Sequence, residues 1–157
     1  MKLLVIKIFG DRMKLAGVYQ FRDRLIVTVH HQTVDNHWKQ RDAFLVAEPT
    51  NPVSVGSVVR EALEAVRYNI PRPTYDSLQS RTYPALEASG VKSHATFMKS
   101  ARHVDVEQNA TTLTIRPFAN QGARGGFQSI EDKAQSLTAP DDAALGAAVL
   151  AAFADTV

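Results

Sequence analysis

The sequence predicts an α+β fold, with a central, mainly antiparallel β-sheet and helices packed against it. Short segments of alternating apolar and polar residues follow one another closely along the chain, which favours antiparallel pairing. Two longer stretches carry apolar residues at helical spacing. A length of 157 residues is typical of one domain, so residues 1–157 are expected to fold as a single unit around their own core.

The first third of the chain contains three segments with strand character. Residues 2–10, KLLVIKIFG, are β-rich and lead into a Gly-Asp turn signal. Residues 17–32 follow, with alternation that can bury one face, and residues 42–49, DAFLVAEP, form the third segment. The alternating apolar positions of the second segment are Leu25, Val27 and Val29. Because the segments are close in sequence, we expect an antiparallel meander.

A helix is predicted next. Ser54 can cap its N-terminus, and apolar residues then recur at helical spacing while charged residues occupy the other side. The apolar positions are Val55, Val58, Val59, Ala62, Leu63 and Val66. Pro71 and Pro73 then disfavour regular structure. Residues 69–91 are therefore expected to form a long surface connection with about one helical turn, and connections of that length often have a function.

The remaining segments predict a short helix and a β-hairpin. Ser93 suits the N-cap of a helix that continues over residues 94–102. The segments HVDVEQ and TLTIRPF alternate on either side of NATT, which predicts a hairpin with one buried face. The residues expected to point inward are Val104, Val106, Leu113 and Ile115.

The chain closes with a second long helical pattern, which starts near Thr138 or at Pro140–Asp141. Its buried stripe consists of Leu145, Val149, Ala152 and Phe153. Gly146 lies inside this helix, where glycine costs about 1 kcal/mol relative to alanine. We therefore expect Gly146 to allow close packing against another element.

Composition excludes several kinds of site and compartment. The chain has no cysteine, which removes disulfides, thiolate zinc sites and cysteine nucleophiles and is consistent with a reducing cytosol. Nothing approaches the roughly 20 apolar residues of a membrane span. Lys7 interrupts the N-terminal apolar run and no small-residue cleavage site follows, which favours a strand over a signal peptide. We expect a cytoplasmic protein with no membrane segment.

Charge is distributed unevenly along the chain. The formal net charge is +2, but residues 1–100 hold 14 Lys/Arg and 9 Asp/Glu, whereas residues 101–157 hold 4 and 7. Such asymmetry suggests a charged partner, although chance over a short chain explains it equally well. The basic residues of the first part are dispersed among acids, without aromatic residues on the same face. A nucleic-acid-binding module is therefore the weakest alternative, and we expect no direct nucleic-acid partner.

The histidines give little indication of a metal site. His30, His31 and His37 lie close together with Asp35, but adjacent strand residues point to opposite faces and the spacing matches no standard zinc pattern. We expect no metal and no cofactor. A small metal-independent nuclease that uses His103, Asp105 and Arg116 remains the enzymatic alternative, because His103 and Asp105 are expected on one strand face.

The glycine-rich stretch NQGARGGFQSIED, residues 120–132, does not form a known phosphate-binding motif. A P-loop requires a Gly-x-x-x-x-Gly-Lys-Ser/Thr pattern that leads into a helix, and no such lysine follows here. A dinucleotide fingerprint requires a parallel strand before the glycines. We interpret the stretch as a surface loop after a core strand.

The last third of the chain resembles the immunity proteins of bacterial contact-dependent growth inhibition (CDI) systems. The similarity is carried by the order of its segments over residues 90–157, and only loosely by residues 1–90. A Gly-x-Lys-Ser segment opens a short helix and HVDV follows. A strand ending in IRPF then leads through a glycine loop and GGF to the final helix, LGAAVLAAF.

The resemblance implies a cytoplasmic binding protein and no enzymatic activity. Such immunity proteins bind the C-terminal toxin domain of a large surface exoprotein, which implies a 1:1 complex with a cognate toxin here. Many of these toxins are nucleases, often acting on transfer RNA. A nuclease cleft is usually basic, and carboxylates on an inhibitor can complement it. The expected toxin-binding residues are Asp105, Glu107, Arg124, Phe127, Glu131 and Asp132.

Overall fold

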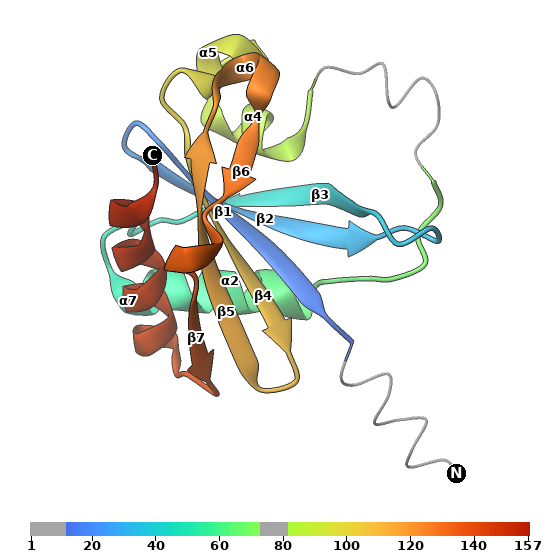
Figure 1. Ribbon diagram of the computed structural model, residues 1–157, viewed down its shortest axis with the longest axis vertical. Helices are drawn as coiled ribbons and strands as arrows, with labels where there is room; N and C mark the ends of the chain where they lie inside the picture. Colours follow the sequence, from blue (N-terminus) through green and yellow to red (C-terminus); the bar gives the residue numbers. More distant parts are fainter. Residues whose placement is uncertain (1–11, 73–81) are drawn as a thin grey trace.

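The computed structural model describes residues 12–72 and 82–157, and these form an antiparallel sheet with helices on both faces (Figure 1). The strand order is β3-β2-β1-β4-β5-β6, and β7 also pairs with β5. All strand pairs are antiparallel. The predicted fold class is therefore confirmed. The strands are β1 (Lys14–Phe21), β2 (Arg24–Gln32), β3 (Trp38–Leu45), β4 (Arg102–Asn109), β5 (Thr112–Asn120), β6 (Phe127–Ser129) and β7 (Gln135–Thr138).

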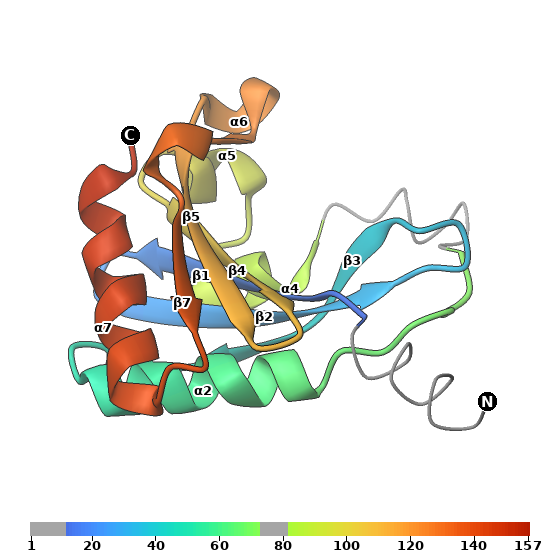
Figure 2. The ribbon, with the colours of Figure 1, turned by 60° about the horizontal axis from the view of Figure 1, so that its bottom comes forward.

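The helices divide between the two faces of the sheet. The two longest, α2 and α7, cover one face, and the short α4 and α5 pack against one end of the other (Figures 1 and 2). In the described part of the chain, no helix is both long enough and apolar enough to cross a membrane. The helices are α2 (Pro52–Glu64), α4 (Pro84–Ser89), α5 (His94–Met98), α6 (Gly122–Gly125) and α7 (Asp142–Ala152), with 3-10 turns at Glu131–Lys133 and Phe153–Asp155.

An antiparallel meander forms, but its strands differ from the predicted ones. Residues 17–32, expected as one strand, contain most of β1 and all of β2, with a turn at Arg22 and Asp23 between them. β1, β2 and β3 pair in sequence order, but the third strand is Trp38–Leu45 rather than residues 42–49. The sequence pattern did not indicate β3 because most of its residues are polar. Among the described strands β3 pairs only with β2, and it is largely exposed, so it needs few apolar residues. The strand expected at residues 2–10 lies outside the described residues.

Helix α2 begins earlier than the sequence indicated. The Asn51 side chain, not Ser54, is the N-cap and accepts hydrogen bonds from the backbone N–H groups of Val53 and Ser54. Pro52 occupies the first turn, where its missing N–H costs nothing. The hydroxyl of Ser54 instead donates to Glu48, 3.3 Å away. The predicted buried stripe is correct at Val55, Val59, Ala62 and Leu63.

The connection over residues 69–91 is only partly a surface segment. Residues 73–81 lie outside the described part, and α4 supplies the expected helical turn. Ala85 and Leu86 are buried rather than exposed, because α4 packs on the sheet beside Phe21 and Ile26. The helix predicted over residues 94–102 is shorter, since α5 ends at Met98 and β4 starts at Arg102.

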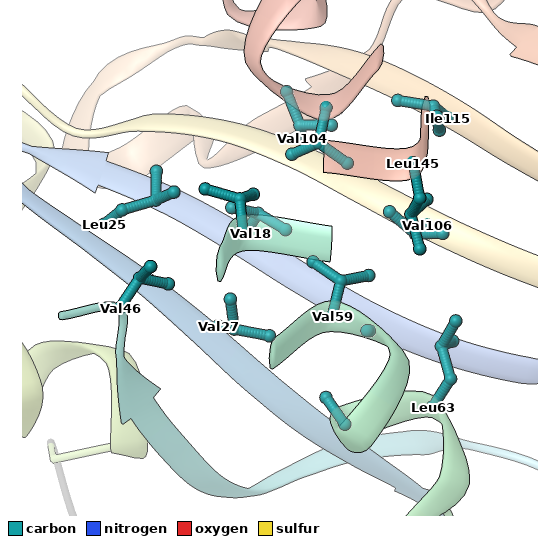
Figure 3. Close-up of a cluster of buried hydrophobic side chains, with 14 of the residues drawn as sticks. Val18, Leu25, Val27, Val46, Val59, Leu63, Val104, Val106, Ile115 and Leu145 are labelled. Atoms are coloured by element: carbon teal, nitrogen blue, oxygen red, sulfur yellow. The ribbon is translucent and has the colours of Figure 1, made fainter. Parts of the chain in front are cut away.

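The main core lies between the sheet and the two long helices. Val104, Val106, Leu113 and Ile115 are each at most 2% exposed, which confirms the predicted inward face of the hairpin. Figure 3 shows Val104 and Val106 of β4 and Ile115 of β5 in one cluster with valines of β1 and β2, and residues of α2 and α7 close the cluster. Burial of this many aliphatic side chains is the largest favourable contribution to folding.

Helices α2 and α7 cross at two glycines. Asp141 is the N-cap of α7, which agrees with the predicted start at Pro140–Asp141 rather than with the one near Thr138. A Cβ added to Gly146 would lie 2.8 Å from the Gly56 nitrogen and 2.6 Å from the Pro52 carbonyl carbon, and closer still to the Pro52 oxygen. A Cβ on Gly56 would meet the Asp142 backbone in the same way. The close packing predicted for Gly146 is confirmed.

Candidate functional site

The alternation of β4 separates an apolar face from a polar one. Val104 and Val106 enter the main core, whereas His103, Asp105 and Glu107 lie on the opposite face of the sheet. The register places Arg116 of β5 directly beside Asp105. Side chains of neighbouring strands on one face are close enough to interact, so this register brings a cation to the carboxylates.

Arg116 binds three carboxylates on this face. Its Nη1 lies 3.0 Å from Glu107 Oε2 and 3.4 Å from Asp105 Oδ1, and its Nε donates to Glu131 Oε2 at 3.1 Å. The side chains of Arg116, Asp105 and Glu107 are 19%, 14% and 22% exposed, whereas Glu131 is 67% exposed. We call Asp105, Glu107, Arg116 and Glu131 the carboxylate cluster.

The carboxylate cluster is net negative because one guanidinium faces three acids. Burial raises the pKa of Asp105 to about 7, and Glu107 adds to this rise while Arg116 opposes it. The hydroxyl of Ser129 and Arg116 both donate to Glu131 and hold the pKa of its carboxyl below the usual range. Of the three carboxylates, Glu131 is the most exposed to solvent and is therefore the one most accessible to a partner.

His103 is part of an aromatic packing group, not of an acid–base pair. Its ring stacks on Tyr19 with centroids 4.2 Å apart, and it also contacts Phe118 and Phe127 at 4.4 and 5.2 Å. Its Nδ1 donates to the Val18 carbonyl at 3.2 Å, and burial lowers its pKa to about 3. Asp105 accepts from Arg116 instead of orienting this ring. The face shared by His103, Asp105 and Arg116 is as predicted, but their arrangement gives no support to base catalysis.

His30 and His31 of β2 have different hydrogen-bond partners, and His37 lies outside this strand, with its Nε2 3.9 Å from Asp35 Oδ2. His30 Nε2 lies 2.9 Å from the Thr28 hydroxyl, and burial lowers the pKa of His30 to about 4. His31 Nδ1 accepts a hydrogen bond from the Arg67 backbone N–H. Across residues 12–72 and 82–157, no three His, Asp or Glu side chains are grouped so as to hold a metal ion.

The glycine-rich stretch forms a tight exposed turn between β5 and β6. We call residues 121–126 the glycine turn, and α6 forms its middle. Gly122 and Gly126 have φ values of +85° and +70°, a backbone conformation that favours glycine. Arg124 is exposed at the turn, whereas the Phe127 ring behind it packs on Tyr19 and His103.

A family model described as CDI immunity protein matches residues 74–156, which is more than half of the chain. The chain belongs to the CDI immunity protein family. This confirms the resemblance over residues 90–157 and extends it towards the N-terminus. No curated protein sequence is similar enough to count as a match.

Two solved structures share the fold of this immunity protein. A protein of unknown function from Neisseria meningitidis, NMB0488, superposes with a TM-score of 0.73 at 14% identity, covering 94% of this chain and 97% of the other. A chain from a CdiA-CT/CdiI toxin and immunity complex of Yersinia pseudotuberculosis gives a TM-score of 0.71 at 15% identity, with 93% and 98% covered. At these identities, the similarity establishes the fold.

The residues expected to contact a toxin fall into three groups. Asp105, Glu107 and Glu131 meet in the carboxylate cluster, and Asp132 is exposed in the adjoining 3-10 turn. Arg124 stands apart in the glycine turn. Phe127 is partly buried and packs within the protein.

Sequence reasoning missed Arg116 as the residue that joins the acids, because it was considered only as a catalytic cation. The signal was the spacing of the hairpin, which sets the register of β4 and β5.

Proposed function

We propose that this protein neutralises the toxin domain of its cognate CDI exoprotein by binding it in a 1:1 complex in the cytoplasm, and that this toxin is a nuclease. Membership of the CDI immunity family supports the class of partner. The observation that supports the contact surface is the carboxylate cluster, in which three acids share one arginine. The surface is compatible with a basic toxin face.

The physical basis is electrostatic complementarity. A nuclease binds a polyanion and therefore presents basic residues around its active site. A net negative surface on the immunity protein attracts such a region over a distance and raises the association rate. Glu131 and Asp132 are exposed and would meet the toxin first, whereas Arg116 holds Glu107 and Asp105 in fixed positions before binding. Preorganised groups lose less conformational entropy on binding.

The test is calorimetry of the purified chain with the toxin domain encoded immediately upstream, followed by stopped-flow association at low and high salt. The proposal predicts 1:1 binding and loss of toxin ribonuclease activity on mixing. The Glu131→Lys/Asp132→Lys variant should associate roughly tenfold more slowly at low salt, with a smaller difference at high salt.

A matched control keeps the change in net charge but moves it to the other side of the sheet. Glu61 and Glu64 are exposed on α2, which covers the opposite face, so Glu61→Lys/Glu64→Lys changes the charge equally. This control should associate much closer to the wild-type rate. Equal slowing by the two variants would show that only net charge matters and would overturn the assignment of the surface. Absence of any binding by the wild-type chain would overturn the function.

A further inference from the structure

The glycine turn is exposed, yet its backbone is closed on itself. The Gln121 N–H donates to the Gly126 carbonyl at 2.8 Å, and the Gly126 N–H donates to the Gly122 carbonyl at 2.9 Å. Among the described residues other than the chain neighbours, no atom would lie within 4 Å of a Cβ added to Gly122 or Gly126. A partner could therefore approach the bare backbone closely at these two positions.

Asn120 fastens the start of the glycine turn to α5. Its Nδ2 donates to the Met98 and Ala101 carbonyls at 2.8 and 2.7 Å, and its Oδ1 accepts from the Gly122 N–H at 2.9 Å. One amide thus joins the C-terminal end of α5 to the first residue of α6. Figures 1 and 2 both show α5 and α6 together at one end of the sheet.

His94 fastens the middle of the same turn. The Tyr83 hydroxyl lies 2.7 Å from His94 Nδ1, and His94 Nε2 lies 3.2 Å from the Ala123 carbonyl oxygen. Because the carbonyl oxygen can only accept, His94 Nε2 donates to it, while Nδ1 is the ring atom that the Tyr83 hydroxyl contacts. This relay connects the N-cap of α4, the first residue of α5 and the residue before Arg124.

These contacts hold an exposed charge in a defined place. Arg124 is exposed, and none of the ion pairs within residues 12–72 and 82–157 includes it. A single hydrogen bond at a surface contributes only about 1 kcal/mol to stability. Fixing the backbone before association, however, removes part of the entropic cost of binding. These hydrogen bonds therefore fix the position of Arg124 before a partner binds.

We propose that the glycine turn is a preorganised toxin-contact element in which Arg124 meets an acidic side chain of the toxin. Asn120 and His94 are positioning residues that act through Arg124. This inference rests on the proposed function and adds a basic contact to the acidic contacts of the carboxylate cluster. The partner surface would then combine basic residues with at least one carboxylate.

The test measures association and dissociation rates of the upstream-encoded toxin domain with a set of variants. Arg124→Ala should weaken binding roughly tenfold, the size of one charge-assisted contact. His94→Ala should weaken it by about three- to tenfold, because Ala123 loses its anchor. His94→Gln retains an N–H donor near the Nε2 position and should restore most of the affinity. Arg41→Ala, an exposed cation on β3 at the other edge of the sheet, is the charge-matched control and should bind like wild type.

A double variant separates positioning from a merely structural role. If His94 acts through Arg124, adding His94→Ala to Arg124→Ala should change the affinity less than twofold, an expectation of about 0.4 kcal/mol or less of residual effect. Equal losses in both backgrounds, or single variants that bind like wild type, would overturn the inference while leaving the proposed function intact. A wild-type chain that fails to bind would instead overturn the proposed function.

Discussion

The crossing of α2 and α7 gives the most direct test of the packing. Replacing Gly146 by alanine adds one methyl group where two helix backbones already touch. The new carbon would lie 2.6 Å from the Pro52 carbonyl carbon, whereas ordinary contact begins near 3.4 Å. The helices would have to separate by at least about 0.8 Å, and backbone atoms cannot rotate away as side chains do.

Two effects of opposite sign determine the size of the change. Alanine is a better helix former than glycine by about 1 kcal/mol, which would stabilise α7. Overpacking a close contact costs about 1–3 kcal/mol, and a displaced α7 also loosens Leu145 and Val149 from the core. We expect overpacking to be at or above the top of this range here. The net loss in unfolding free energy should be about 2 kcal/mol or more.

Urea unfolding followed by circular dichroism measures this loss, and thermal unfolding should show a Tm lower by about 4–8 °C for a chain of this size. Ala147→Gly is the control, because Ala147 is exposed on the same helix. It should cost about 1 kcal/mol through helix propensity alone. A Gly146→Ala variant more stable than wild type would show that propensity outweighs the contact and would refute the reasoning.

Three further predictions follow from single contacts. Asn51→Ala should lower the unfolding free energy by about 1 kcal/mol, because α2 loses its N-cap, whereas Ser54→Ala should lower it by less than about 0.5 kcal/mol. Urea unfolding measures both changes. A larger loss for Ser54→Ala than for Asn51→Ala would indicate that Ser54 is the cap. Arg60→Ala should lower the unfolding free energy by about 1 kcal/mol, because the Arg60 guanidinium joins α2 to Asp142 at 2.7 Å and also donates to the Pro140 carbonyl. High salt should not abolish the hydrogen bond to Pro140. An unfolding free energy equal to that of wild type would show that the pair is solvated. Because the folded pKa of Asp105 is raised to about 7, its contribution to stability is present below the unfolded pKa of about 4 and is lost as pH rises through about 7. Asp105→Asn avoids this loss, so its stability relative to wild type should increase between pH 4 and 8, by at most about 4 kcal/mol, and a pH-independent difference would contradict the shift.

The buried faces were predictable because apolar side chains alternate on strands and recur on helices. Val104 and Val106 identified the inward face of β4 without any knowledge of its partner strand. Gly146 indicated a helix contact because glycine is otherwise unfavourable there. The start of α2 was missed because Asn51 and Ser54 are both good caps, and only the chain path through Pro52 decides between them. β3 was misplaced because an exposed, polar edge strand has no apolar signature.

The candidate site could be predicted only in part. Asp105 and Glu107 were placed on one face by the period of two, but their shared contact with Arg116 depends on the register between two strands. The anchoring of Ala123 by His94 joins residues that are far apart in sequence, and a single sequence gives no signal for it. Phe127 was expected to contact the toxin, but its partial burial against Tyr19, which is far away in sequence, could not be predicted.

The most direct test of the central claim is a protection assay. Bacterial cells would express the toxin domain encoded upstream together with the wild-type chain, the Glu131→Lys/Asp132→Lys variant or the Glu61→Lys/Glu64→Lys control, at equal protein levels. Growth and intact cellular RNA would be measured over time. The account predicts full protection by the wild-type chain and the control, and weakened protection by the cluster variant. Cells that die with the wild-type chain present would contradict the account.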